Sequence, residues 1–196
     1  MSNAPETPAR LEQIITTAER LFRERGYLAT SVRDIGQAVG MRGPSLYHHI
    51  GGKEDLLCTI ADRAARDFLA ALQPILDEPA PAAVKLRRAV VAHVGVITRN
   101  LNAAGVYFNE WRHLSDARRA EFLRQRDLYE NGFRVILAQG IQEGHFAAMD
   151  EKFGARFVLS ALNWTHQWYR PGGPLTPEEI GHTLADLVLQ GLEHKA

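Results

Sequence analysis

The chain has 196 residues, 45% of them hydrophobic and 23% charged, and its 23 Lys and Arg balance its 23 Asp and Glu to a formal net charge of zero. This composition is ordinary for a globular protein with a substantial core, and zero net charge argues against a protein that coats nucleic acid indiscriminately. The single cysteine, Cys58, excludes an intrachain disulfide, and no apolar run approaches the roughly 18 residues of a membrane span. Because the first residues also lack an apolar stretch, we expect no signal peptide and a cytoplasmic protein without a membrane partner.

The first residues, "MSNAPETPAR", predict a short disordered arm that precedes the first helix. Apolar residues then recur at helical spacing from Leu11 to Phe22, and Gly26 follows as a stop signal. A second helix is predicted from the cap Ser31 to Gly40, with Asp34 in its first turn. The arm and the first two helices therefore occupy the first 40 residues.

The third helix can only be short, because it runs from Pro44 to the Gly51-Gly52 stop. A fourth helix begins near Lys53, and the proline-rich stretch "PILDEPAPAA" is the clearest boundary in the chain. Helical spacing continues beyond it, and no alternating strand pattern and no internal repeat is found. The later helices are predicted at residues 86–101, 115–141, 153–169 and, after a capping box that starts at Thr176, 177–192. The predicted fold class is all-α.

Two short helices joined by "GMRG" match a helix-turn-helix, whose second helix enters the major groove of DNA. Tyr47, His48 and His49 then lie on the exposed side of that helix, while Leu46 and Ile50 hold it against the domain. The alternative is that the three aromatic residues pack in an ordinary bundle. A metal site at the histidine pair is disfavoured, because adjacent residues point to different faces of a helix.

The charges of the N-terminal region are balanced overall, since residues 1–58 contain seven Lys and Arg and seven Asp and Glu. Three cations, Arg33, Arg42 and Lys53, nevertheless gather around the turn and the short helix. A handful of placed cations is sufficient for phosphate contacts. The local charge therefore fits a DNA-binding surface, although the balance of the whole region counts against it.

The stretch "LFRERGYLATSVRDIGQAVGMRGPSLYHHIGGKEDLL" resembles the N-terminal domain of the TetR family of bacterial transcriptional regulators. The resemblance implies DNA contacts at the start of the second helix, along the third helix and at Lys53. Arg42 joins them through its place in the turn. The predicted DNA-binding residues are Ser31, Val32, Arg33, Arg42, Gly43, Pro44, Ser45, Tyr47, His48, His49 and Lys53.

The C-terminal part is similar to members of the family that respond to acyl-coenzyme A thioesters, most clearly in "NEWRHLSDARRAEFLRQRDLYE" and "LNWTHQWYRPGGPLTPEEIGHTLADLVLQGL". The resemblance implies an effector pocket and dimerisation through the last two helices. Core packing or dimer contact is the alternative for each pocket residue. The candidate effector residues are Trp111, Arg112, Asn163, Trp164, Gln167 and Trp168. The candidate dimerisation residues are Phe157, Ala161, Leu184, Leu187, Val188 and Leu192.

The sequence thus predicts a DNA-binding domain at residues 1–55 and a ligand-binding and dimerisation domain at residues 56–196. The predicted function is that of a repressor that binds double-stranded operator DNA as a homodimer and is released by a small effector, with no resident cofactor and no metal. Two alternatives stay open. One is a small all-α enzyme, although the chain lacks a nucleophile elbow. The other is a DNA-binding adaptor that takes no ligand.

Overall fold

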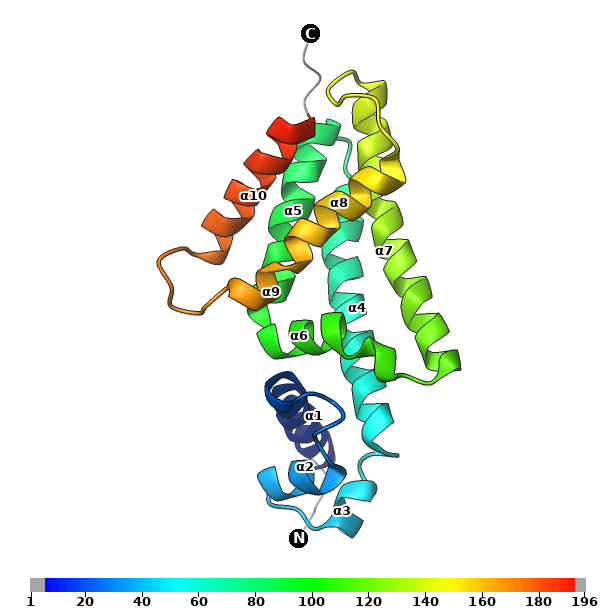
Figure 1. The fold of residues 1–196 in the computed structure, drawn as a ribbon, viewed down its shortest axis with the longest axis vertical. Coiled ribbons are helices and arrows are strands. Elements are labelled where there is room, and N and C mark those ends of the chain that lie inside the picture. Colours follow the sequence, from blue (N-terminus) through cyan, green and yellow to red (C-terminus); the bar gives the residue numbers. More distant parts are fainter. Residues whose placement is uncertain (1–5, 193–196) are drawn as a thin grey trace. The chain divides into compact units, whose positions relative to one another are not determined.

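The computed structural model describes residues 6–192, and within this range it contains helices and connecting turns but no β-strand (Figure 1). The predicted all-α class, with an N-terminal helix-turn-helix and a C-terminal helical domain, is therefore confirmed. The helices are α1 (Glu6–Arg25), α2 (Val32–Ala38), α3 (Gly43–Tyr47), α4 (Lys53–Asp77), α5 (Ala82–Arg99), α6 (Leu101–Asn109), the 3-10 helix η1 (Trp111–His113), α7 (Asp116–Gln142), α8 (Glu151–Asn163), α9 (Thr165–Trp168) and α10 (Pro177–Leu192). None of the described helices is both long and apolar enough to cross a membrane.

The described residues pack into two compact units. The first unit comprises residues 6–64 and 102–122, and the second comprises residues 65–101 and 123–192. Both α4 and α7 contribute residues to the two units. This division by packing is distinct from the division by function at residues 55 and 56, which stays a prediction.

Several helix bounds differ from those expected from the sequence. The first helix begins at Glu6, so the arm is shorter than residues 1–10, of which residues 1–5 lie outside the described range. The fourth helix runs through Pro74 to Asp77, although a proline in the last turn has no N–H to donate to the carbonyl four residues earlier. The single helix expected over 153–169 is two helices, broken at Trp164.

Two predicted helix starts are confirmed. The Ser31 hydroxyl accepts a hydrogen bond from the backbone N–H of Asp34, and the Asp34 carboxylate accepts one from the backbone N–H of Ser31. The same reciprocal pair joins Thr176 and Glu179 at the start of α10. Both are capping boxes, which satisfy the N–H groups that a first turn leaves without partners. These hydrogen bonds also lower the pKa of Asp34 and of Glu179 below the ordinary carboxyl value.

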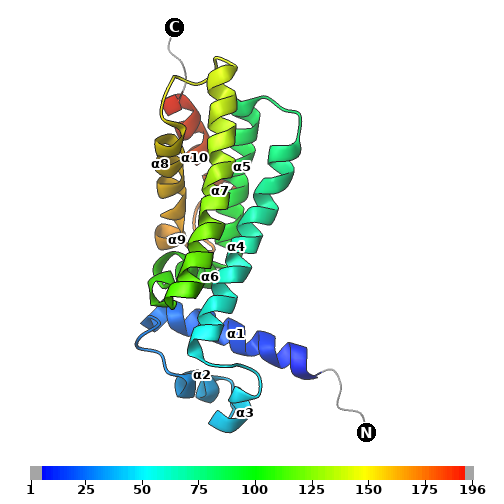
Figure 2. The ribbon, with the colours of Figure 1, turned by 90° about the vertical axis from the view of Figure 1, so that its right-hand side faces the viewer.

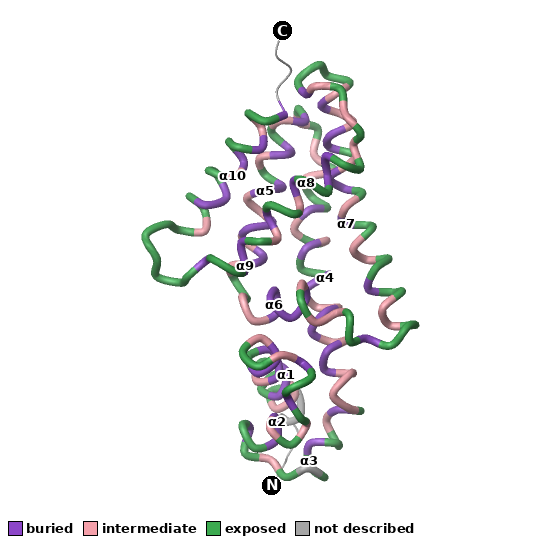
Figure 3. The backbone as a smooth tube through the Cα atoms, viewed as in Figure 1, coloured by how far each residue is buried: buried purple, intermediate pink, exposed green. Residues whose placement is uncertain are grey.

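The core of the first unit forms where α1, α2 and α3 meet, and its side chains from these helices are fully or almost fully buried (Figure 3). Tyr27, which follows α1, packs edge-on against Phe22 and stacks on His113 with ring centroids 5.4 Å apart. Its backbone N–H donates to the Glu110 carboxylate over 3.2 Å. The segment around η1 therefore belongs to the same packing unit as the helix-turn-helix.

The second unit is a helical bundle in which α10 lies along α5 (Figures 1 and 2). A glycine at position 181 permits this approach, because a Cβ there would lie 3.0 Å from the Cα of Val91. The residues of α5 that face the bundle are buried, among them Leu86, Val90 and Val94. The helical spacing of apolar residues that predicted this helix from the sequence therefore corresponds to its buried face.

Replacing Gly132 with valine is expected to destabilise the fold by about 1–3 kcal/mol, the usual cost of overpacking a core. Gly132 lies in α7, and a Cβ added there would come within 2.5 Å of the Cδ2 of Leu72, which is itself buried. Gly95→Val is the matched control, because a Cβ at that position of α5 would meet only the end of the Arg99 side chain, at 3.4 Å. Urea unfolding of the two variants measures the difference, and equal midpoints would contradict the close contact.

Candidate nucleic-acid interface and effector region

The helix-turn-helix consists of α2, the turn at residues 39–42 and α3. Gly40 has a φ of +67°, a left-handed conformation that a glycine adopts without steric cost, and the N–H of Met41 donates to the carbonyl of Gly36 over 2.8 Å. Pro44 lies in the first turn of α3, where its missing N–H costs nothing. The turn therefore has a defined geometry that sets α3 against α2.

The side chains of α3 divide between an inner and an outer side. Leu46 and Ile50 are buried, as predicted, whereas 57% of the Tyr47 side chain is exposed. The helix ends at Tyr47, earlier than the expected stop at Gly51, so His48 and His49 lie in the turn that follows it. His48 is exposed and His49 is half-buried. The short helix thus presents one large aromatic side chain to solvent, as a recognition helix requires.

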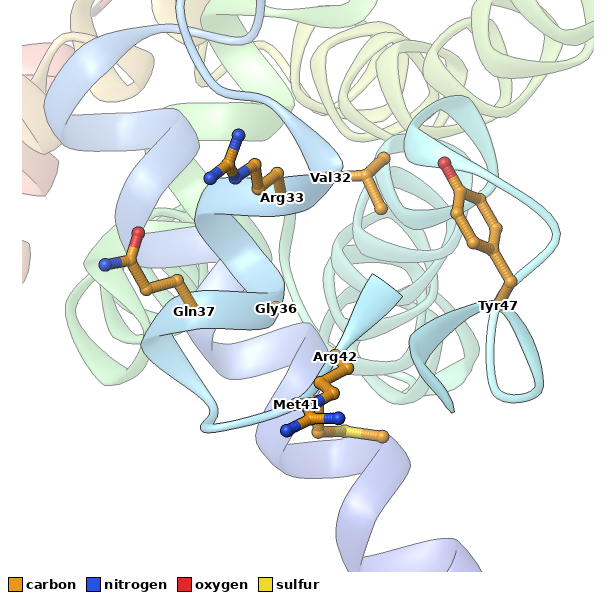
Figure 4. Close-up of a pocket in the computed structure, with 7 residues that line it drawn as sticks. All are labelled: Val32, Arg33, Gly36, Gln37, Met41, Arg42 and Tyr47. Atoms are coloured by element: carbon orange, nitrogen blue, oxygen red, sulfur yellow. The ribbon is translucent and has the colours of Figure 1, made fainter. Parts of the chain in front are cut away.

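A groove of about 460 Å³ opens between α2 and α3 (Figure 4). Arg33 projects from α2, Arg42 precedes α3 and Tyr47 ends it, so two cations and a phenol share one groove. Both arginines are at least partly exposed, and the Arg42 side chain makes no capping hydrogen bond to α3. The lining residues are Val32, Arg33, Gly36, Gln37, Met41, Arg42 and Tyr47.

Four of the predicted DNA-binding residues line this groove, namely Val32, Arg33, Arg42 and Tyr47. Others lie outside it. Ser31 serves as the cap of α2, and the ammonium of Lys53 donates to the carbonyl of Tyr27 over 3.0 Å and lies 4.1 Å from the centre of its ring. The remaining ones are on or next to α3: Gly43, the exposed Pro44 and Ser45, and the pair His48 and His49.

Three groove residues were not predicted as DNA contacts from the sequence, namely Gly36, which is buried, Gln37 and Met41. Gln37 is exposed and follows Arg33 by four positions on α2, which places both on the same face of that helix. A glutamine amide can donate to and accept from a base edge, as adenine recognition requires. The spacing of four from Arg33 could have indicated Gln37 as a DNA contact from the sequence alone. Met41 had no such signal, because its place depends on the fold of the turn.

The candidate effector residues are divided between the two units. Trp111 and Arg112 belong to the first, where Trp111 stacks on Phe122 with centroids 5.7 Å apart and the Arg112 guanidinium lies 5.5 Å from the Trp111 ring. The others belong to the second unit. Asn163 is half-buried there, whereas Trp164, Gln167 and Trp168 are exposed. The six residues therefore do not form one buried cluster within either unit.

The candidate dimerisation residues lie on α8 and α10. Phe157, Ala161 and Leu187 are exposed and Leu184 is half-buried. Val188 and Leu192 are each 8% exposed, so their surface is already covered within the chain. On α8 and α9 the exposed apolar residues recur at helical spacing and form one stripe, which consists of Phe153, Phe157, Ala161, Trp164 and Trp168. Two of the tryptophans predicted for the effector thus belong to this stripe.

Two family models match the chain. Residues 14–58 match the bacterial regulatory proteins of the tetR family, and residues 79–192 match the tetracyclin repressor-like C-terminal domain. The chain belongs to the TetR family of transcriptional regulators. The first match covers the whole of α2, the turn and α3, and the second covers α5 to α10.

Three TetR family relatives extend this comparison. The transcriptional repressor KstR2 of Mycolicibacterium smegmatis is 32% identical over 96% of this chain and 95% of its own length. The regulator PfmR of Thermus thermophilus is 38% identical, with a TM-score of 0.84 over 92% of this chain and 99% of its own. AibR, solved in complex with isovaleryl coenzyme A and operator DNA, is 28% identical, with a TM-score of 0.81 over 94% of this chain and 98% of its own.

As a TetR family member, the chain is a DNA-binding transcriptional regulator of the helix-turn-helix class, related to repressors. Regulators of this family bind operator DNA as homodimers, and repression that a small effector relieves is their typical mode of action. The family membership fixes the partner of the helix-turn-helix as double-stranded DNA. The identity of the effector and the residues that contact the DNA and the effector depend on features of this particular chain.

Proposed function

We propose that the chain is a repressor that acts in the cytoplasm, reads its operator with the groove between α2 and α3, and leaves the DNA when it binds an acyl-coenzyme A thioester or a related hydrophobic metabolite. The observation that carries the DNA contact is that Arg33, Arg42 and Tyr47, all exposed, line one groove. Arginine and tyrosine donate to phosphates and to base edges, and Gln37 adds a group that reads adenine.

The remaining predicted DNA contacts have separate roles in this proposal. Pro44, Ser45 and His48 are exposed on α3 and in the turn after it, where they would meet the walls of the major groove. The backbone at Gly43 and Ser31, and the half-buried His49, lie at the margins. Lys53 acts indirectly, because its contacts with Tyr27 hold the start of α4 against the helix-turn-helix.

The proposed dimer surface is the exposed apolar stripe of α8 and α9 together with Leu187 of α10. Large exposed apolar patches on a folded protein generally mark an interaction site. The side chains of Phe153, Phe157 and Leu187 are 73%, 63% and 62% exposed. Trp164 and Trp168 fit this surface better than a buried pocket, because their side chains are exposed on the same stripe.

The effector class is supported by AibR, whose structure contains isovaleryl coenzyme A, and by the resemblance of the C-terminal sequence to thioester-responsive regulators. Such an effector must bind the DNA-released conformation more tightly than the DNA-bound one, by a coupling free energy of typically about 1–3 kcal/mol. The relatives are transcriptional regulators. We accordingly assign no catalytic role to the chain, and the enzyme alternative is not favoured.

Fluorescence anisotropy on the DNA upstream of the chain's own gene tests the proposal. Saturable binding should weaken with salt, with a slope of log K against log salt of about −0.9 for each phosphate contact. Arg42→Ala should reduce the magnitude of this slope by about 1.8 for a dimer, which loses one contact per subunit. Arg119→Ala, at an exposed ion pair on α7, is the control and should leave the slope unchanged. An unchanged slope in Arg42→Ala would remove that residue from the interface, and weak binding indifferent to sequence would contradict the repressor function.

A further inference from the structure

A histidine lies at the centre of the second unit, where four helices meet. His93 of α5 is 1% exposed, and aromatic residues of α4 and α7 surround its imidazole. The centroid of the His93 imidazole lies 4.8 Å from the ring centroid of Phe68, 5.7 Å from that of Tyr129 and 6.5 Å from that of Phe133. Asn163, the last residue of α8, lies beside the ring, so that α8 is the remaining one of the four helices. Burying a polar ring in this way is costly unless both its nitrogens have partners.

Only one of the two nitrogens of His93 makes a well-formed hydrogen bond to a described residue. Nδ1 lies 2.9 Å from the hydroxyl oxygen of Tyr129. Nε2 is buried and makes no hydrogen bond of ordinary geometry, and the neighbouring Asn163 side chain interacts with the ring only weakly, in the sense that favours its protonated form. Burial is the larger influence, and it lowers the pKa of His93 to about 3, so the ring is neutral at physiological pH. An unpartnered buried polar atom is rare in native proteins and calls for an explanation.

The backbone next to this atom is interrupted. The helix α8 ends at Asn163, and α9 begins at Thr165, which is fully buried and whose hydroxyl oxygen also lacks a hydrogen-bond partner among the described residues. Both α8 and α9 pack against α5, the helix that carries His93. The structure therefore places two unpartnered polar atoms beside a helix break, where a segment can shift without breaking a continuous run of helical hydrogen bonds.

We infer that His93, held by Tyr129 and assisted by Asn163, is the group that recognises the carbonyl of the effector's acyl chain. With the Tyr129 hydroxyl donating to Nδ1, the ring proton sits on Nε2 and donates to a carbonyl oxygen that enters beside Asn163. The Asn163 amide supplies a second donor. The rings of Phe68 and Phe133 form apolar walls for the carbons next to the carbonyl.

The chemistry of this cluster selects against a charged ligand group. Its five side chains, Phe68, His93, Tyr129, Phe133 and Asn163, carry no charge when the imidazole is neutral. A carboxylate placed there would lose its hydration and gain no cation in return. The site therefore takes an uncharged acyl carbonyl, such as that of a thioester, and rejects the free acid. This inference rests on the proposed function, and it names which part of the effector the second unit reads.

The test compares two ligands that differ only in the carbonyl. Octanoyl-coenzyme A has the thioester carbonyl, and the thioether S-octyl-coenzyme A has a methylene in its place. Isovaleryl-coenzyme A and S-isopentyl-coenzyme A form a second, shorter pair. Release of labelled operator DNA from the full chain is measured for each ligand. The wild type should respond to the better thioester at a concentration about tenfold lower than to its thioether, the effect of one buried hydrogen bond.

In His93→Phe this preference should fall to about twofold or less, because phenylalanine keeps an aromatic ring but has no donor. Asn163→Ala should reduce it in part, and since Asn163 is half-buried, this variant tests the site even if His93→Phe does not fold. Phe146→Leu, a buried change near Gly140 and outside the cluster, controls for a loosened core. It should lower the melting temperature and keep the tenfold preference.

Two results would overturn the inference, and they are distinguishable. If His93→Phe and Asn163→Ala both keep the full preference for the thioester, the carbonyl is recognised elsewhere while the proposed repressor function stands. If neither thioester releases the wild type from an operator that it binds tightly, the effector class is wrong, and the assignment of His93 to its carbonyl is wrong with it.

Discussion

Replacing Tyr47 with alanine is expected to weaken operator binding at least tenfold and to leave the fold intact. Tyr47 ends α3, lines the groove with Arg33 and Arg42, and is 57% exposed, so its truncation removes no core contact. A hydrogen bond to a charged group such as a phosphate contributes about 1.5–3 kcal/mol, which is more than tenfold in affinity for each recognition helix. A dimer loses two such contacts, so the measured effect on the whole operator is larger.

The matched control is Leu28→Ala in the same unit. Leu28 is 74% exposed and does not line the groove, so its removal also leaves the core untouched. Anisotropy titrations at one salt concentration, with urea unfolding of each variant, separate binding from stability. Equal operator affinity for Tyr47→Ala and Leu28→Ala would mean that the groove does not face DNA. A loss in both would indicate a general effect on the domain.

The features that the sequence predicted correctly are set by residues close together in the chain. The capping boxes at Ser31 and Thr176 each depend on a carboxylate three positions later. The burial of Leu46 and Ile50 agrees with their spacing of four, because the backbone N–H of Ile50 still donates to the carbonyl of Leu46 although Ile50 lies beyond α3. The helix-turn-helix could be predicted for the same reason, since its glycines, its proline and its apolar pairs all lie within one local stretch.

The bounds that were wrong depend on competition between local signals and packing. Pro44 and the Gly51-Gly52 pair suggested a helix that extends to residue 50, but the chain leaves helical geometry after Tyr47. Pro74 suggested a boundary, yet α4 continues to Asp77, where buried Leu72 and half-buried Leu76 hold it against the bundle. Pro74 removes one backbone hydrogen bond of α4, and the packing of the helix still carries it to Asp77.

The sequence could not separate the core residues of the C-terminal helices from the candidate dimer residues. A helix that packs in the core with one face and forms a dimer contact with another has apolar residues on both faces. The spacing along α10 could not separate Leu187, which is exposed, from Val188 and Leu192, which are covered by the chain itself. In the same way, His93 has the spacing of an ordinary core residue of α5. Its unpartnered nitrogen becomes visible only when Tyr129 and Asn163 are placed around it.

Introducing a charge at Leu187 is expected to separate the dimer and to weaken operator binding with it. The side chain is 62% exposed on α10 and is proposed to lie at the dimer surface with the stripe of α8 and α9. Burying a leucine contributes about 1.5–3 kcal/mol, and an unpaired arginine left in an apolar interface costs about 3–5 kcal/mol. The dissociation constant of the Leu187→Arg dimer should therefore rise by at least about a hundredfold.

Leu128→Arg is the matched control, because Leu128 is a similarly exposed leucine on α7 that lies outside the proposed surface. Sedimentation over a concentration series should give a monomer for Leu187→Arg and a dimer for Leu128→Arg, and only the unfolding midpoint of Leu128→Arg should rise with protein concentration. Operator affinity should fall only for the variant that is a monomer, because a monomer binds one half-site and loses the contribution of the second. A Leu187→Arg dimer of undiminished stability would move the interface away from α10 and would leave the stripe of α8 and α9 as its remaining candidate.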